Sequence, residues 1–160
     1  KNKKIINIEN KFFIALFRSL LVSIIVFGLG GITALLCYLI AALISKILLE
    51  TINYVEHYGL VREEGKPVKP RHSWNSNTFI SSAFTFNLTR HSAHHEKAHL
   101  PYWKLDPYSD APKMPFGYLT TFFIALLLPF LYRKIMAKKL QDWDKNFASE
   151  GERKLISQFS

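Results

Sequence analysis

Residues 12–45 read FFIALFRSLLVSIIVFGLGGITALLCYLIAALIS, and this 34-residue stretch decides the fold class because it holds one charged residue, Arg18. A helix crosses a bilayer with about 20 apolar residues and seldom needs more than about 25, so the stretch is too long for one simple span. The cluster Gly28-Leu29-Gly30-Gly31 lies near its middle, where glycine favours a bend. The pattern predicts two helices, over residues 12–27 and 32–56, joined as a hairpin.

A single long span with Arg18 reaching one interface is the alternative interpretation of this stretch. Its apolar core is too extended for a secretory signal peptide. The rest of the chain is polar around one further apolar run. We expect one domain, 1–160, with membrane helices at 12–49, a histidine-rich region at 50–115, an apolar run at 116–132 and a charged tail of helical pattern at 133–160.

The distribution of basic residues predicts the membrane topology. The chain has 21 Lys and Arg against 12 Asp and Glu, a formal net charge of +9. Five of the basic residues lie in the first 18 positions, eight in 50–115 and seven in 133–160, so all three regions are expected on the cytoplasmic side. A hairpin at 12–49 returns the chain to its starting side, which agrees with this distribution. A full crossing at 116–132 would instead put the basic tail on the outside. That 17-residue run, which contains Pro129, is therefore expected to be an interfacial or re-entrant helix.

Composition excludes several classes of protein. Hydrophobic residues make up 49% and aromatic residues 14% of the chain, which excludes a disordered chain, and the single cysteine, Cys37, excludes an internal disulfide framework. Basic flanks beside apolar segments explain the net charge without a nucleic-acid partner. The same charge could attract anionic lipid or an acidic redox partner, and the sequence does not choose between them. The expected fold class is an all-α integral membrane protein.

Histidines are concentrated next to the membrane segments, and one group has helical spacing. In the run Arg90-His91-Ser92-Ala93-His94-His95, positions i, i+3 and i+4 of a helix place His91, His94 and His95 on one side. Neutral imidazoles gathered in this way suit a transition metal such as Zn, Cu, Fe or Ni. Structural zinc or coincidence remains open, although zinc sites of that kind usually recruit thiolates.

A second polar cluster ends the long apolar helix. Glu56 precedes His57, and Asn53 lies one turn earlier, where polar groups are costly unless they face a partner or a cavity. A carboxylate here could orient the His57 imidazole by accepting its second N–H. Trp74 and Trp103 are the tryptophans expected nearest to this site.

Several segments together resemble one family, the membrane alkane hydroxylases (alkane 1-monooxygenases), and the related xylene monooxygenase hydroxylase subunit. The segments are N-Y-V-E-H-Y-G-L at 53–60, R-H-S-W-N at 71–75 and L-T-R-H-S-A-H-H at 88–95, continued by K-M-P at 113–115, W-D at 143–144 and G-E-R at 151–153. The resemblance covers essentially the whole chain and only the C-terminal half of the family. It implies a partial desaturase-like fold and a membrane-embedded, non-haem di-iron oxygenase.

Carried over residue by residue, the resemblance implies metal ligands at His57, His91, His94 and His95. It also makes Glu56 and Asn53 candidates for orienting those ligands, whereas His72 and His99 match no ligand position. Two departures stand out. The family's earlier H-x-x-x-H and H-x-x-x-H-H boxes are absent, so the set of ligands for two irons is incomplete, and a truncated, inactive fragment is expected rather than a split protein. Ala93 also replaces an expected acidic residue, which removes one orienting carboxylate.

For the intact protein the resemblance implies O2-dependent hydroxylation of terminal methyl groups of alkanes or of alkyl- and methyl-aromatics. Electrons would come from a rubredoxin or a ferredoxin-type reductase, since the chain has neither a C-x-x-C pair nor a flavin motif. The expected location is a bacterial inner membrane, crossed more than once, with the histidine-rich region cytoplasmic. A fatty acid desaturase with the same metals and a non-enzymatic, metal-holding membrane protein are the alternatives, and the substrate stays open.

Overall fold

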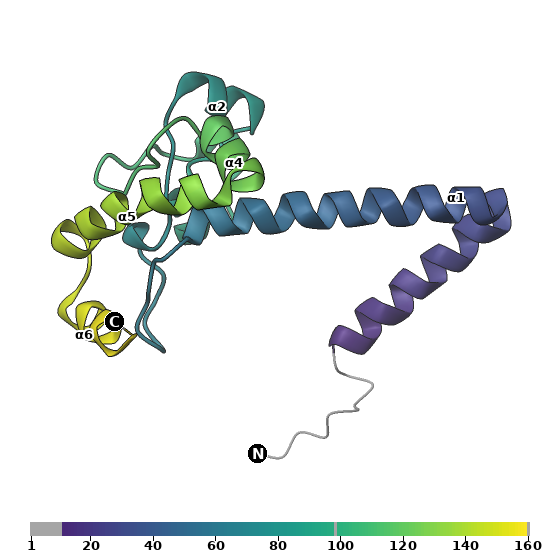
Figure 1. Ribbon diagram of the computed structural model, residues 1–160, viewed down its shortest axis with the longest axis horizontal. Coiled ribbons are helices and arrows are strands. Elements are labelled where there is room, and N and C mark those ends of the chain that lie inside the picture. Colours follow the sequence, from purple (N-terminus) through teal and green to yellow (C-terminus); the bar gives the residue numbers. More distant parts are fainter. Residues whose placement is uncertain (1–10, 98, 160) are drawn as a thin grey trace, which may run out of the picture. The chain divides into compact units, whose positions relative to one another are not determined.

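The computed structural model describes residues 11–97 and 99–159, and in this part of the chain every named element is helical. The chain divides after Leu49 into two compact units. The helices are α1 Lys11–His57, η1 Pro70–His72, α2 Phe79–Phe84, α3 His91–Glu96, η2 Tyr102–Lys104, α4 Tyr118–Leu127, α5 Pro129–Asn146 and α6 Glu150–Phe159 (Figure 1). The expected all-α class is confirmed.

Within the first unit, α1 bends sharply at Gly31, where Figure 1 shows the ribbon turning back. Gly31 has φ 64° and ψ −160°, a backbone conformation that glycine adopts far more readily than other residues. The predicted break within the glycine cluster is therefore confirmed. Among the described residues α1 is the one helix long and apolar enough to cross a membrane, judged by length and composition. Two separate crossings remain a prediction.

The surface of the first unit suits a lipid environment. Large apolar side chains are exposed along it, and Leu29, at 86%, shows how little the unit buries by itself. Its serine hydroxyls donate to backbone carbonyls one turn earlier, from Ser19 to Ala15 at 3.0 Å and from Ser45 to Ala41 at 2.8 Å. Polar groups satisfied within their own helix are what a bilayer requires.

The core of the second unit is formed mainly by aromatic residues and methionine. Its fully buried members include Trp74, Tyr132, Met136 and Trp143, packed with Val55 from the end of α1. Both tryptophans also use their indole N–H: Trp74 donates to the Tyr58 carbonyl at 2.9 Å and Trp143 to the Arg71 carbonyl at 2.7 Å. The core thereby holds the loop that follows α1.

The apolar run at 116–132 is divided between two helices. Leu128, with φ −132° and ψ 58°, ends α4, and Pro129 begins α5. At about 1.5 Å per residue, the 10 residues of α4 extend about 15 Å, half of a typical hydrocarbon core. Helix α4 alone is too short to cross a membrane. Its interfacial or re-entrant placement stays a prediction, while the expected helices of the tail are present as α5 and α6.

Candidate metal centre

Three histidines from two helices converge in the second unit. His57 is the last residue of α1, and His91 and His95 lie one turn apart on α3. The ligand atoms of these three side chains all lie within 4.8 Å of one another. His91 Nε2 is 3.1 Å from His57 Nε2 and 2.8 Å from His95 Nε2.

These separations fit nitrogen ligands of a metal ion better than they fit hydrogen bonds. A neutral imidazole nitrogen offers either one N–H or one lone pair in the ring plane, so His91 Nε2 can form a hydrogen bond to only one of its two neighbours. Two nitrogens bound at about 2.1 Å and at right angles to one metal ion lie about 3.0 Å apart. The residues present therefore fit a metal ion, which would use the lone pairs that the imidazoles direct at one another.

The protonation of this cluster also suits metal binding. Burial, together with the neighbouring His95, His57 and His94, lowers the pKa of His91 to about 3. Burial and the nearby His57, His94 and Arg62 likewise lower the pKa of His95. Both rings are therefore held as neutral imidazole, the form that binds a metal.

The orientation of His57 is set by a backbone carbonyl. Its Nδ1–H donates to the carbonyl oxygen of His72 at 3.2 Å, which leaves Nε2 free to face the other two histidines. The expectation that a carboxylate beside His57 accepts this proton is wrong. The carbonyl has the effect expected of a carboxylate because it, too, fixes which nitrogen of His57 carries the proton.

Glu56 lies beside His91 instead, as neighbouring helical residues point in different directions. Its side chain is 1% exposed, and Oε2 lies 3.4 Å from His91 Nε2. The Tyr118 hydroxyl donates to Oε1 at 3.0 Å, and the Glu56 carbonyl accepts the Trp74 backbone N–H at 2.8 Å. Glu56 is thus a buried carboxylate next to the metal cluster, held by α4 and the core.

Helix α3 is positioned by Asn75, from the loop after η1. The Asn75 side-chain oxygen accepts the backbone N–H of Ser92 at 2.9 Å, near the start of α3. Its Nδ2 donates to Ser92 Oγ at 2.6 Å and to the Ser73 carbonyl at 2.8 Å, and Ser92 Oγ donates to the Pro70 carbonyl at 2.6 Å. These contacts connect the helix that carries His91 to the loop that follows α1.

The remaining sequence-based candidates lie outside the group of three. The His94 ring is 6.0 Å from those of His91 and His95, centre to centre, and its role as a ligand stays a prediction. Asn53 and His99 are exposed. Trp74 packs beside the site as expected, and its backbone N–H donates to the Glu56 carbonyl. Trp103 is 64% exposed and makes an edge-on contact with Tyr102, and its place near the site stays a prediction.

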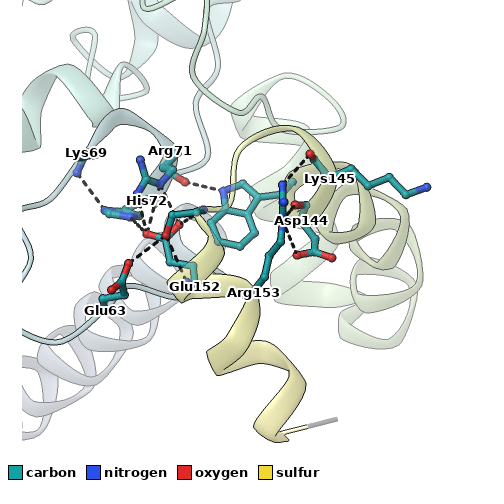
Figure 2. A network of polar contacts seen from close by, with 10 residues as sticks. Glu63, Lys69, Arg71, His72, Asp144, Lys145, Glu152 and Arg153 are labelled. Atoms are coloured by element: carbon teal, nitrogen blue, oxygen red, sulfur yellow. Dashed lines mark hydrogen bonds and ion pairs between the residues drawn. The ribbon is translucent and has the colours of Figure 1, made fainter.

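His72 belongs to a separate buried network around Glu152, drawn in Figure 2. Its Nδ1 accepts the Lys69 backbone N–H at 3.0 Å and its Nε2 lies 2.7 Å from Glu152 Oε1. The Arg71 guanidinium donates to both carboxylate oxygens of Glu152, at 3.0 and 2.9 Å. Both ring nitrogens of His72 are occupied, which agrees with leaving it out of the ligand set.

The charge of Glu152 is strongly favoured by its surroundings. Burial alone would raise its pKa, but hydrogen bonds from Arg71, the Ser149 backbone N–H and His72 outweigh burial and lower the pKa to about 2. Sequence reasoning assigned no role to Glu152 or Tyr118. The resemblance included Glu152 in a matching segment, but no local spacing connects residues about 80 positions apart.

Two histidines of the cluster also face a hollow of about 250 Å³ at the surface of the second unit. It is lined by His57, His95 and His72, with Leu60, Val61, Arg62 and Val68 around them. A metal ion or a further ligand can therefore approach the two more exposed histidines from this side.

Comparisons with known proteins find relatives of this chain. The family model of the fatty acid desaturases matches residues 2–137. The xylene/toluene monooxygenase hydroxylase component of Pseudomonas putida is 33% identical over 149 residues, which is 93% of this chain and 40% of that protein. Alkane 1-monooxygenase 2 of Alcanivorax borkumensis is 36% identical over 146 residues, 88% of this chain and 38% of that protein.

Alkane 1-monooxygenase 1 of Pseudomonas aeruginosa is 41% identical over 116 residues, or 69% of this chain and 30% of that protein. The chain thus spans less than half the length of these relatives. The segment that the family model matches contains all three histidines of the candidate metal centre.

Proposed function

This chain belongs to the fatty acid desaturase family, and from that we propose that it supplies histidine ligands to the non-haem di-iron centre of a membrane monooxygenase. The reaction proposed for the whole protein is the hydroxylation, with O2, of terminal methyl C–H bonds of alkanes or of alkyl- and methyl-aromatics. The names of its relatives, alkane and xylene/toluene monooxygenases, support this reaction class. The long apolar helix α1 supports a place in the membrane.

The observation that carries the proposal is the approach of His57 to His91 and His95. These side chains come from separate helices, and their ligand atoms lie within 4.8 Å of one another. Within a membrane-anchored chain of this family, neutral imidazoles so placed support iron binding. His94 is proposed as a further ligand, and the ligands still missing for two irons would come from elsewhere in the whole protein.

The histidines of the cluster and the residues that contact them have distinct proposed parts in the site. When bound, the two irons would supply the O2 chemistry that an unactivated C–H bond requires. His57, His91 and His95 would hold the metal, and the His72 carbonyl would keep the proton of His57 on Nδ1. Glu56, kept in place by Tyr118, lies 3.4 Å from His91 Nε2, the nitrogen that would face the metal, and is proposed to support the centre from the core side. Asn53 is exposed and is proposed to act only at the margin of the site.

Substrate and electrons would reach the whole protein from different phases. A hydrocarbon partitions into the bilayer, so a membrane enzyme receives it from lipid rather than from water. Electrons are proposed to come from a rubredoxin or a ferredoxin-type reductase, which would dock on a basic cytoplasmic face. The proposed location is a bacterial inner membrane, crossed more than once, with the histidine-rich region in the cytoplasm.

Metal analysis of the purified chain tests the proposal. We expect the chain, kept in detergent and loaded anaerobically with Fe(II), to retain iron through His57, His91 and His95. His57→Ala, His91→Ala and His95→Ala should each reduce iron binding by about tenfold or more, whereas the exposed His99→Ala is the matched control and should bind like the wild type. Iron binding that survives all three substitutions would refute the proposal.

The same preparation separates the alternatives. A chain that excludes iron but binds one zinc tightly would favour the non-enzymatic, metal-holding protein. For the whole protein, product analysis with octane, xylene and a fatty acyl substrate, with O2 and a reductant, separates hydroxylase from desaturase: an alcohol supports the first and a new double bond the second. His94→Ala decides whether His94 is a ligand. We expect iron binding without turnover from this chain alone.

A further inference from the structure

We propose that Glu152 of α6 is a positioning residue for the metal centre, acting on His57 through His72. The inference rests on the proposed metal site, but Glu152 does not touch any of the proposed ligands. It is the acceptor at the centre of the network in Figure 2, which joins the C-terminal helix to the turn η1. The effect would be to fix the direction in which His57 presents Nε2.

Glu152 is buried, and both of its carboxylate oxygens accept hydrogen bonds. Its side chain is 2% exposed. Oε1 receives His72 Nε2 at 2.7 Å and the Arg71 guanidinium at 3.0 Å, while Oε2 receives Arg71 Nε at 2.9 Å and the Ser149 backbone N–H at 2.8 Å. A charged acceptor with several donors holds those donors more firmly than a neutral one would.

The hydrogen bonds of His72 assign its protons. Because Nδ1 accepts the Lys69 backbone N–H, the ring proton is on Nε2 and is donated to Glu152. The ring is therefore anchored at both nitrogens, and the backbone of the same residue is kept in place. The carbonyl of that backbone accepts the Nδ1–H of His57 at 3.2 Å.

A second anchor holds the same turn from α5. The Trp143 indole N–H donates to the Arg71 carbonyl at 2.7 Å, next to the residue that faces His57. The turn η1 is thus held on one side by a buried tryptophan and on the other by Glu152. Removing Glu152 would free the side chains of Arg71 and His72 and let the His72 carbonyl move away from His57.

Binding of Co(II), a spectroscopic substitute for Fe(II), tests this role in the purified full chain. We expect Glu152→Ala to weaken Co(II) binding by about tenfold, the lower end of the effect of partners that orient metal ligands, and to change the visible absorption bands that report ligand geometry. Glu152→Gln keeps one oxygen acceptor for His72 and should restore most of the affinity. A substitution that only loosened the fold would leave the bands of the bound fraction unchanged.

Arg153→Ala is the matched control on the same helix. Arg153 donates to the Asp144 and Lys145 carbonyls of α5, at 2.8 and 3.0 Å, and has no contact with His72 (Figure 2). This variant should therefore bind Co(II) with the affinity and spectrum of the wild type. Circular dichroism would check that each variant is folded.

The outcomes are distinct. Wild-type affinity and spectrum in folded Glu152→Ala would overturn the inference. If Glu152→Ala does not fold, His72→Phe decides, since it keeps the ring volume and leaves Glu152 paired with Arg71. Weakened binding with altered bands in His72→Phe then supports the inference, and unchanged binding overturns it. Failure of the wild-type chain to bind Co(II) or Fe(II) would instead refute the metal site itself.

Discussion

The Nε2 atoms of His57 and His91 lie 3.1 Å apart, although the two residues are separated by 34 positions in the chain. One ends α1 and the other begins α3, so the contact joins the end of the long apolar helix to α3. Two supports hold the residues of this contact in place. The His72 carbonyl accepts the Nδ1–H of His57, and Asn75 is hydrogen-bonded to α3. Substitutions at these supports, or in the loop that carries them, should therefore disturb the contact.

Asn75→Ala should lower the free energy of unfolding by about 2–4 kcal/mol. The substitution leaves the buried Ser92 N–H and the Ser73 carbonyl without their partner, and unsatisfied buried polar groups cost about 1–3 kcal/mol each. Chemical denaturation in detergent, followed by tryptophan fluorescence, measures the change. Asn77→Ala is the control, because Asn77 is exposed and its loss should change stability by less than about 0.5 kcal/mol. Equal stabilities of the two variants would contradict the role of Asn75.

Gly59→Ala should destabilise the chain more than Gly65→Ala. Both glycines have positive φ, 71° and 75°, so each substitution costs about 1–2 kcal/mol in backbone strain. A β-carbon at Gly59 would also lie 2.6 Å from Leu140 Cδ2 on α5, whereas at Gly65 no atom lies within 4 Å. Leu140 must therefore move in Gly59→Ala alone, which adds to the destabilisation of that variant.

Thermal unfolding of these two glycine variants, measured side by side with the wild type, gives the comparison. The midpoint should fall further for Gly59→Ala, and iron binding should weaken with it because this loop continues directly from His57. Equal losses of stability in Gly65→Ala and Gly59→Ala would show that the contact with Leu140 does not contribute to the difference.

Acid should remove the contribution of Glu152 to stability. In the folded chain, hydrogen bonds outweigh burial and lower the pKa of Glu152 to about 2, against 4.5 for the free side chain. A lowered pKa stabilises the folded state above about pH 4.5, on the order of 3 kcal/mol here, and this is lost as the pH falls from about 4.5 towards 2. The difference in unfolding free energy between the wild type and Glu152→Gln should be constant from pH 7 to 5 and shrink below pH 4.5. A difference that stayed constant down to pH 3 would contradict the lowered pKa of Glu152 in the folded chain.

The bend of α1 could be predicted from the sequence because its cause is local. Thirty-four nearly uncharged residues exceed one span, and a glycine cluster is where such a helix breaks most easily, as Gly31 does. The helical spacing of the histidines was also readable, but spacing alone could not choose among them. His94 is as close in sequence as His95, yet only His95 joins the group of three, because His57 approaches α3 from that side.

The sequence by itself determined a helical, membrane-directed chain with imidazoles suited to a metal, since hydropathy, charge and helical period depend on neighbouring residues. Only the tertiary structure decided which atoms support those imidazoles. In the folded chain a backbone carbonyl accepts the Nδ1–H of His57, and Glu56 lies next to His91. Glu152 of α6 contacts His72. Contacts of this kind join residues far apart in the chain, and their geometry exists only once the core around Trp74 and Trp143 has packed.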